Sequence, residues 1–304
     1  MAISRTQLVK ELEPGLNALF GLEYKRYENQ HAEIYVTESS DRAFEEEVML
    51  SGFANAQTKA EGSGVAFDSA QETYTARYTH DTIALAFAIT EEAIEDNLYD
   101  RISSRYTKAL ARSMSNAKQV KAVTPLIDGL PSTDSFDSGD GVSLFNTAHT
   151  TVSGTNVKNT LTTQADLNET SLEQSLIDIA AMTDERGLRI AARGVKMIIP
   201  SANQFTAERL MKSQGRTGTA DNDINAIGSM GMIPQGYRVN NYLTDSDAFY
   251  IITDVPNGMK MFQRAPLKTA MEGDFDTGNV RYKARERYVF GASDYRGIFG
   301  VEGA

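Results

Sequence analysis

Apolar positions recur with helical spacing between residues 90 and 124, and this is the longest regular pattern in the chain. The recurring side chains, four residues apart, are Ile94, Leu98, Ile102, Tyr106 and Leu110. Thr90 is a suitable N-cap, and Pro125 is predicted to end the helix. Such a helix is roughly 50 Å long at ~1.5 Å per residue. A single apolar stripe of that length needs a sheet or another helix along it.

A shorter helical stripe occupies the first 30 residues. Its members are Leu8, Leu12, Leu16, Leu19 and Phe20. Pro14 and Gly15 interrupt the stripe, which predicts two short helical pieces with Pro14 in the first turn of the second. Because so short a stripe cannot bury itself, it either packs against its own domain or forms an arm that docks on a neighbouring subunit.

Between these stretches the periodicity becomes strand-like. The apolar and aromatic members of the alternation are Tyr74, Ala76, Tyr78, Ile83, Leu85, Phe87 and Ile89. A polar stretch rich in glycine and alanine, from Phe53 to Val65, precedes them. The pattern predicts a long two-stranded ribbon with a glycine-rich tip. An isolated ribbon is barely stable in water, so a long one needs a surface to lie on.

From residue 165 to about residue 260 the pattern predicts a compact α/β unit. Thr170 to Glu173 is a capping box before an apolar stripe, and Gly187 closes that helix. A second helix begins at the capping box that starts with Ser201 and runs to about Met211. Strands are predicted at residues 195–199, 237–240 and 249–253.

The C-terminal part returns to strand periodicity, first at residues 259–262. Further on, four cations occupy alternate positions: Arg281, Lys283, Arg285 and Arg287. Strand geometry places all four on one face. Such a face is either solvated or an interface with an acidic partner, such as Glu45–Glu47 of another subunit. Nucleic-acid binding comes third, because no aromatic stacking platform accompanies the cations.

Composition excludes several kinds of site. The chain has 304 residues and a net charge of −11, with no cysteine and three histidines that lie far apart in sequence. Disulfides, thiolate nucleophiles and cysteine metal sites are therefore ruled out, and no histidine pair has metal-ligand spacing. No apolar run is long enough to cross a membrane. The acidic balance lacks the basic footprint of a domain that grips phosphate backbones.

Motifs for phosphate, dinucleotide, hydrolase or zinc-protease chemistry do not occur. The glycine cluster from Gly228 to Gly236 is predicted to be an adaptable loop. Asp134, Asp137 and Asp140 precede Gly141, but their spacing is not that of a calcium loop. We therefore predict no catalytic, cofactor-binding or metal site, and the residues favour a structural or assembly protein over an enzyme.

Two stretches, Phe262 to Leu267 and Arg285 to Gly300, resemble major head (capsid) proteins of tailed bacteriophages. The order of elements is similar to the Hong Kong 97-type capsid fold, an α+β architecture. The resemblance divides the chain into five parts: an N-terminal arm at 1–44, an extended β-ribbon loop at 45–89, a peripheral domain at 90–165 with the spine helix at 90–124, an axial α/β domain at 166–262, and a C-terminal return to the peripheral domain at 263–304.

The resemblance implies a structural subunit that assembles with itself, as hexamers and pentamers, into an icosahedral shell around the double-stranded DNA of a tailed phage. It implies no enzymatic activity, no cofactor, no membrane and no sequence-specific DNA binding. The extended loop and the arm would lie across a neighbour, and axial domains would meet at capsomer centres.

Further implied partners are a portal, cementing proteins and a scaffolding protein. The scaffolding protein is expected to be separate or already removed, because the chain begins with a short arm and not with a long charged segment. The expected location is the virion, after assembly in the cytoplasm of the host bacterium. Lys59 lies near the loop tip, but no asparagine partner can be identified, so no crosslink is predicted.

The candidate subunit-interface residues come from the arm, the loop and the cationic strand: Leu8, Leu12, Leu16, Phe20, Glu45, Glu46, Glu47, Phe53, Lys59, Phe67, Tyr74, Tyr78, Arg281, Lys283, Arg285 and Arg287. An encapsulin-like compartment shell is an alternative with the same fold. A soluble α+β enzyme with carboxylate chemistry is the alternative of another class, and it predicts a deep pocket with a carboxyl group of raised pKa.

Overall fold

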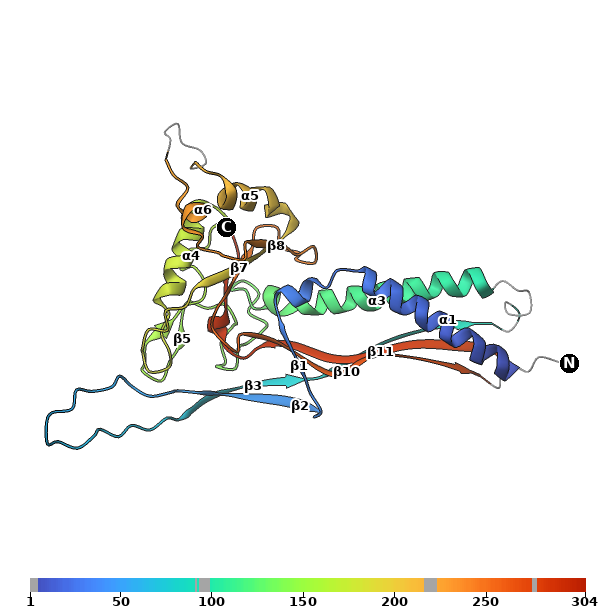
Figure 1. Cartoon of the computed structure of the whole chain (residues 1–304), viewed down its shortest axis with the longest axis horizontal. Coiled ribbons are helices and arrows are strands. Elements are labelled where there is room, and N and C mark those ends of the chain that lie inside the picture. Colours follow the sequence, from blue (N-terminus) through green and yellow to red (C-terminus); the bar gives the residue numbers. More distant parts are fainter. Residues whose placement is uncertain (1–4, 91, 93–98, 216–222, 275–277) are drawn as a thin grey trace.

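A long flat unit, a rounder unit at one end of it and a narrow projecting ribbon make up the chain (Figure 1). The N-terminal helix lies along the flat unit, and the C-terminus lies in the rounder one. In this computed structural model, backbone alone describes residues 5–12 and 99–102. All described residues together are 5–90, 92, 99–215, 223–274 and 278–304.

Two helices run side by side along the flat unit, α1 (Arg5–Arg26) and α3 (Tyr99–Asp128) (Figure 1). The predicted break at Pro14 is wrong, because α1 is one helix. Its second half buries Leu16 and Phe20 against α3, which offsets the backbone hydrogen bond that a proline removes. After α1, a short 3-10 helix, η1 (Gln30–Glu33), leads into the first strand.

The spine helix differs from the prediction at its C-terminal end, and part of its predicted beginning lies outside the described residues. The predicted end at Pro125 is wrong, since α3 continues to Asp128. The last turn is retained because Leu126 is fully buried in the core of the rounder unit. Residues 91 and 93–98 of the predicted helix, which include Ile94 and Leu98, lie outside the described residues.

A four-stranded sheet forms the floor of the flat unit, with the order β1-β10-β11-β4. Its strands are β1 (Val36–Ser39), β4 (Asp81–Ile89), β10 (Met259–Gly273) and β11 (Val280–Ala292). β1 is parallel to β10, and the other pairs are antiparallel. Residues 83–89 were predicted to belong to the ribbon, which is wrong, because β4 pairs with β11 and turns Ile83 and Phe87 toward the helices.

The ribbon itself is formed by β2 (Phe44–Leu50) and β3 (Glu72–Thr79), which pair antiparallel. Residues 51–71 connect the two strands without further secondary structure. The predicted glycine-rich tip is therefore confirmed as the far end of a two-stranded ribbon (Figure 1).

The rounder unit is built on a second four-stranded sheet with the order β12-β9-β7-β8. Its strands are β7 (Gly194–Ile199), β8 (Tyr237–Val239), β9 (Phe249–Thr253) and β12 (Ile298–Val301). Three helices accompany it: α4 (Glu169–Ala181), α5 (Gln204–Lys212) and α6 (Ala226–Met230). Short elements complete it: β5 (His149–Thr150), β6 (Asn156–Val157), η2 (Ser201–Asn203) and η3 (Tyr295–Gly297).

Two boundary predictions for the rounder unit need correction. The cap of α4 is Asn168, whose side chain accepts from Ser171 N–H at 2.9 Å, and not the predicted Thr170 box. The last strand, β12, pairs with β9, so the end of the chain does not stay in the flat unit. It joins the second sheet because its side chains are fully buried there. How the family's domains divide the chain stays a prediction.

One continuous core links the two units. It lies around the second sheet and includes Val123 and Leu126 from the end of α3 and Tyr288 from β11. A smaller core between α1, α3 and β11 contains Phe20, Met114 and Tyr282. The end of the spine helix and the end of β11 therefore anchor the flat unit in the rounder one.

Candidate subunit-interface surfaces

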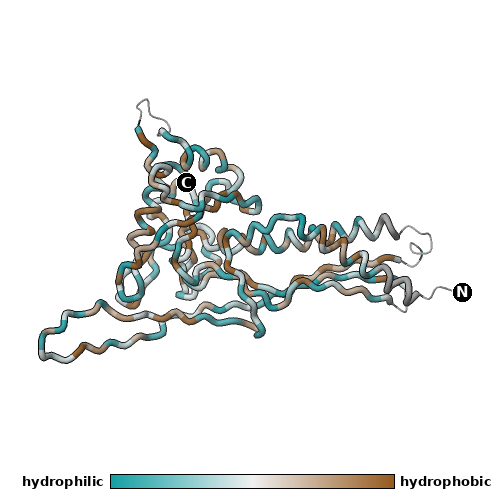
Figure 2. Tube along the Cα trace, in the orientation of Figure 1, coloured by the Kyte–Doolittle hydropathy of each residue, from teal (hydrophilic) through white to brown (hydrophobic). Residues whose placement is uncertain are grey.

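The free part of the ribbon carries apolar side chains that the rest of the subunit does not cover. Phe53, Val65 and Phe67 are 61%, 68% and 98% exposed. Hydrophobic positions are interspersed with hydrophilic ones along this segment (Figure 2), and Lys59 is exposed among them. Apolar groups that project from a body in this way mark a contact surface.

Two ribbon residues that the sequence analysis did not select belong to the same surface. Val48 is 45% exposed and Leu50 is 62% exposed, on the face of β2 that also carries Phe44. Their period-two spacing was the signal that could have identified them, because alternate residues of a strand share a face.

The acidic run Glu45–Glu47 is already engaged within its own chain. Glu45 Oε1 accepts from Ser40 Oγ at 2.7 Å. Glu46 pairs with Arg77 across the ribbon at 3.7 Å, and Glu47 accepts from Lys260 Nζ. Glu45 thus has a serine partner, and Glu46 and Glu47 have cationic partners, within the same chain. A contact between this run and another subunit's cationic strand stays a prediction.

Tyr74 and Tyr78 also serve the subunit itself. Tyr78 is 3% exposed and meets the ring of Phe262 edge-on, with 4.8 Å between the centroids. Tyr74 stacks on Tyr295 at 6.4 Å. Both rings lie where the ribbon joins the body, so they hold the ribbon and do not present a surface to a neighbour.

The four cations of β11 lie on one face of the first sheet, as predicted. Arg281, Lys283 and Arg285 are exposed, and Arg287 is half-buried. Their antiparallel partners on β4 include exposed alanines: Ala84, Ala86 and Ala88. On the other side, Lys268 of β10 stands opposite Arg285 and is also exposed. The result is a flat cationic face with few bulky side chains, where Asp274 pairs with Arg281.

The arm divides into two parts. Leu16 and Phe20 are 5% and 2% exposed, in the small core with Met114 of α3. Their role as contacts to a neighbour is corrected, because the chain's own spine helix covers them. The side chains of Leu8 and Leu12 lie outside the described part of α1.

Two buried carboxyl groups bear on the enzyme alternative. Burial raises the pKa of Glu286, although Lys118 Nζ lies 3.1 Å away and opposes the shift. Burial also raises the pKa of Asp294 against the opposing charge of Arg296. Glu286 is 0% exposed and Asp294 is 7% exposed, so the chain's own atoms cover both groups. Each acts as half of a buried ion pair, and neither is presented to a substrate.

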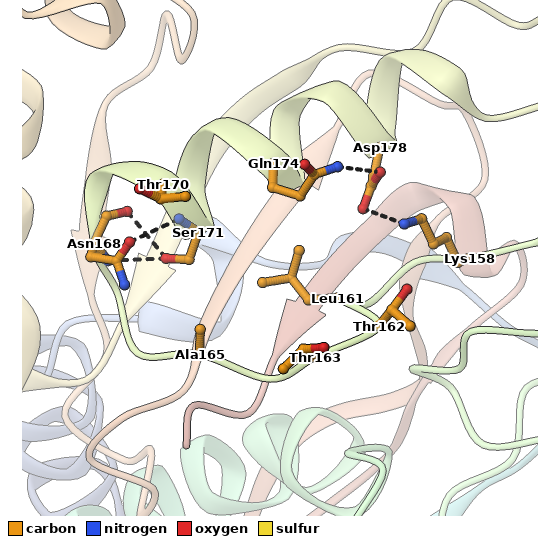
Figure 3. A pocket seen from close by; sticks show the side chains of 10 residues that line it. All are labelled: Lys158, Leu161, Thr162, Thr163, Ala165, Asn168, Thr170, Ser171, Gln174 and Asp178. Atoms are coloured by element: carbon orange, nitrogen blue, oxygen red, sulfur yellow. Dashed lines mark hydrogen bonds and ion pairs between the residues drawn. The ribbon is translucent and has the colours of Figure 1, made fainter.

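A cavity of about 400 Å³ lies between α4 and residues 158–168 (Figure 3). Its charged groups satisfy one another, since Lys158 Nζ lies 2.8 Å from Asp178 Oδ2. Gln174 donates to the other oxygen of Asp178 at 2.9 Å. The cavity thus contains a neutralised ion pair and hydroxyl groups, with no activated nucleophile or base among these residues.

Within the described residues, no group of three or more acidic, histidine or cysteine side chains could hold a metal ion. None of the described helices is long and apolar enough to cross a membrane.

Comparisons with known proteins add the family. A family model described as phage capsid protein matches residues 72–301, whereas no curated protein sequence matches the chain. Among solved structures, a Mycobacterium phage Patience chain has a TM-score of 0.58 at 11% identity, covering 99% of this chain and 89% of that chain. The capsid of Myoviridae phage XM1 gives 0.53 at 9% identity, covering 89% and 90%.

A virus-like particle from Pyrococcus furiosus has the same fold, with a TM-score of 0.51 at 8% identity over 94% of this chain and 98% of that chain. These likenesses agree with the Hong Kong 97-type expectation for the fold. The matched segment spans the ribbon strand β3, the spine helix, the second sheet and all strands of the first sheet except β1. The chain therefore belongs to the phage capsid protein family, and it is a structural subunit of a virion's capsid shell.

Proposed function

We propose that copies of this chain form the hexamers and pentamers of an icosahedral phage head that encloses double-stranded DNA. The main support for this proposal is the free ribbon, whose Phe53, Val65 and Phe67 side chains are mostly exposed in the single subunit. Burying three such side chains contributes about 1.5–3 kcal/mol each. In a shell every subunit has neighbouring copies of the same chain, so a neighbour would cover each ribbon in the assembled state.

The cationic face of the first sheet is a candidate surface for binding the ribbon of a neighbouring subunit. The loop of the ribbon, residues 51–71, contains two acidic residues and one basic residue, a net charge of −1. The sheet face presents Arg281, Lys283, Arg285 and Lys268 with exposed alanines beside them. Alanines let a strand approach closely, and the aliphatic stems of arginine and lysine can cover apolar rings. We assign the neighbour's ribbon to this face.

The remaining parts of the proposal concern partners and place. We propose a separate scaffolding protein, a portal and cementing proteins as partners, and assembly in the cytoplasm of the bacterial host. The net charge of −11 suits a wall that does not adhere to the packaged DNA. No catalytic role is assigned, because the buried carboxyl groups are paired within the subunit.

Deletion of residues 54–64 tests the function. These residues contribute no strand pairing, so the subunit should keep its circular dichroism and melting temperature. It should fail to form shells in negative-stain electron microscopy and sedimentation. A length-matched variant, Phe53→Ser/Val65→Ser/Phe67→Ser, keeps the ribbon and should also assemble less than the wild type.

Normal particles from the deletion variant would overturn the ribbon's role. The contents of wild-type particles separate the two kinds of shell. Encapsidated DNA supports the phage head, whereas a protein cargo without DNA would replace it with the encapsulin-like compartment. A wild-type chain that stays monomeric with scaffolding protein and crowding agents would contradict the shell function altogether.

A further inference from the structure

The base of the ribbon packs closely against the body of its own subunit. On β3, Tyr78 packs between Phe262 and β11, and its hydroxyl shares a hydrogen bond with Ser293 Oγ. Directly beneath the ring is Gly291, where an added Cβ would lie 2.5 Å from Tyr78 Cε1. That distance is shorter than any ordinary contact, so the ring fits only over a glycine.

A buried lysine fastens the other strand of the ribbon. Lys260 of β10 is 6% exposed and lies between two carboxylates of different strands. Its Nζ is 3.2 Å from Glu38 Oε1 on β1 and also donates to Glu47 on β2. Because the cation is desolvated, both carboxylates are held to it more firmly than in an exposed pair. The lysine therefore ties β2 to the edge of the sheet.

The rounder unit also contacts this part of the ribbon. Gly139 lies against β3 so closely that an added Cβ would be 2.8 Å from Tyr74 Cδ2 and 2.9 Å from Ala76 N. Further along, Arg186 donates to the carbonyl oxygen of Ser69. The ribbon base thus has contacts to both units.

These contacts stop where the free part of the ribbon begins. The pairing of the two strands extends to Ser51, whose N–H donates to Gln71 O at 2.9 Å. Across the connecting loop, Asp68 accepts from Ala54 N–H in an exposed hydrogen bond. The ribbon therefore has a firmly seated base and a loosely tied tip.

We propose that Tyr78, Gly291 and Lys260 are positioning residues that set the direction of the ribbon before a subunit meets its neighbour. This rests on the proposed function only in taking the ribbon as an assembly element. A two-stranded ribbon has little stability alone, so a free one would sample many directions. Seating it in advance lowers the entropy lost when the neighbour binds, which is the general benefit of preorganisation.

The direction of the ribbon can be measured on unassembled subunits. Because the chain has no cysteine, Glu72→Cys on the ribbon and Ser113→Cys on α3 give one pair of exposed spin-label sites. Double electron–electron resonance then reports the distance between ribbon and spine helix. The test variants are Gly291→Ala, which displaces the Tyr78 ring, and Lys260→Met, which removes both ion pairs. The matched control is Gly273→Ala, where no atom lies within 4 Å of an added Cβ.

Both test variants should shift or broaden the distance distribution, while the control coincides with the wild type. Circular dichroism identifies any variant that does not fold. If Gly291→Ala does not fold, the distance distribution of Lys260→Met tests the proposal. If the distance distributions of the folded test variants equal that of the wild type, these residues do not set the direction of the ribbon and the proposal is wrong. Shell yield is scored separately, so a wild type that forms no shells would defeat the proposed function and leave the distance measurement intact.

Discussion

The buried ion pair between Lys118 and Glu286 offers a sharp test of how the flat unit is held together. Glu286 is 0% exposed on β11, and its carboxylate lies 3.1 Å from Lys118 Nζ on α3. Tyr24 on α1 adds its hydroxyl at 3.5 Å. Three elements therefore meet at one carboxyl group.

Replacing Lys118 with methionine leaves the carboxylate buried without its cation, which costs about 3–5 kcal/mol. The double variant Lys118→Met/Glu286→Leu removes both charges and should recover most of that loss. The control is Lys121→Met on the same helix. Its ion pair with Asp81 has side chains 39% and 59% exposed, so its loss should cost less than about 1 kcal/mol.

The pH dependence has a definite sign. Burial raises the pKa of Glu286 above its ordinary value of 4.5. The favourable contribution is present in full below pH 4.5 and is lost as the pH rises through the higher pKa of the folded state. Without Lys118 that pKa rises further, so Lys118→Met should lose more stability at pH 7 than at pH 5.

Urea denaturation of the four proteins at pH 5 and pH 7, followed by circular dichroism, measures these quantities. A cost for Lys118→Met no larger than that of Lys121→Met would refute the reasoning. Failure of the double variant to recover stability would also refute it, because the penalty would then come from lost packing and not from an unpaired charge.

Two further outcomes are expected. Burial and the nearby Lys118 lower the pKa of His31 from 6.5 to about 4, so stability should fall as the pH drops through that window. In urea titrations, His31→Asn should reduce the slope of unfolding free energy against pH by at most about 1.4 kcal/mol per pH unit. A slope equal to that of the wild type would contradict this. Lys283→Glu/Arg285→Glu reverses the exposed cationic face. It should abolish shells in sedimentation with an unchanged melting temperature, whereas Arg112→Glu on α3 should assemble normally, and intact shells from the double reversal would exclude this face as the acceptor.

Strong local periodicity made several elements predictable. β9 falls at the predicted residues 249–253, and the four cations of β11 share a face as their alternation required. The glycine-rich tip of the ribbon was also evident, because glycine and small polar residues between two alternating stretches leave few other structures. In each case neighbouring residues alone carry the information.

The errors occurred where packing between distant segments outweighed a local signal. Pro14 and Pro125 were expected to break helices, but buried side chains beside them keep α1 and α3 continuous. β4 alternates like a ribbon strand, yet it pairs with β11, about 200 residues later in the chain. Strand alternation specifies which face is buried, and it does not specify the partner strand.

The candidate surfaces show the same division. Sequence by itself determined that the chain has an exposed, glycine-rich loop, a cationic strand face and no cysteine, because these follow from residue type and spacing. Only the tertiary structure decided which candidates remain free. Glu45–Glu47, Tyr74 and Tyr78 are engaged within the subunit, whereas Phe53 and Phe67 are left uncovered. The reason is that exposure depends on which segments pack against one another, and contacting residues such as Tyr78 and Gly291 are more than 200 residues apart in the sequence.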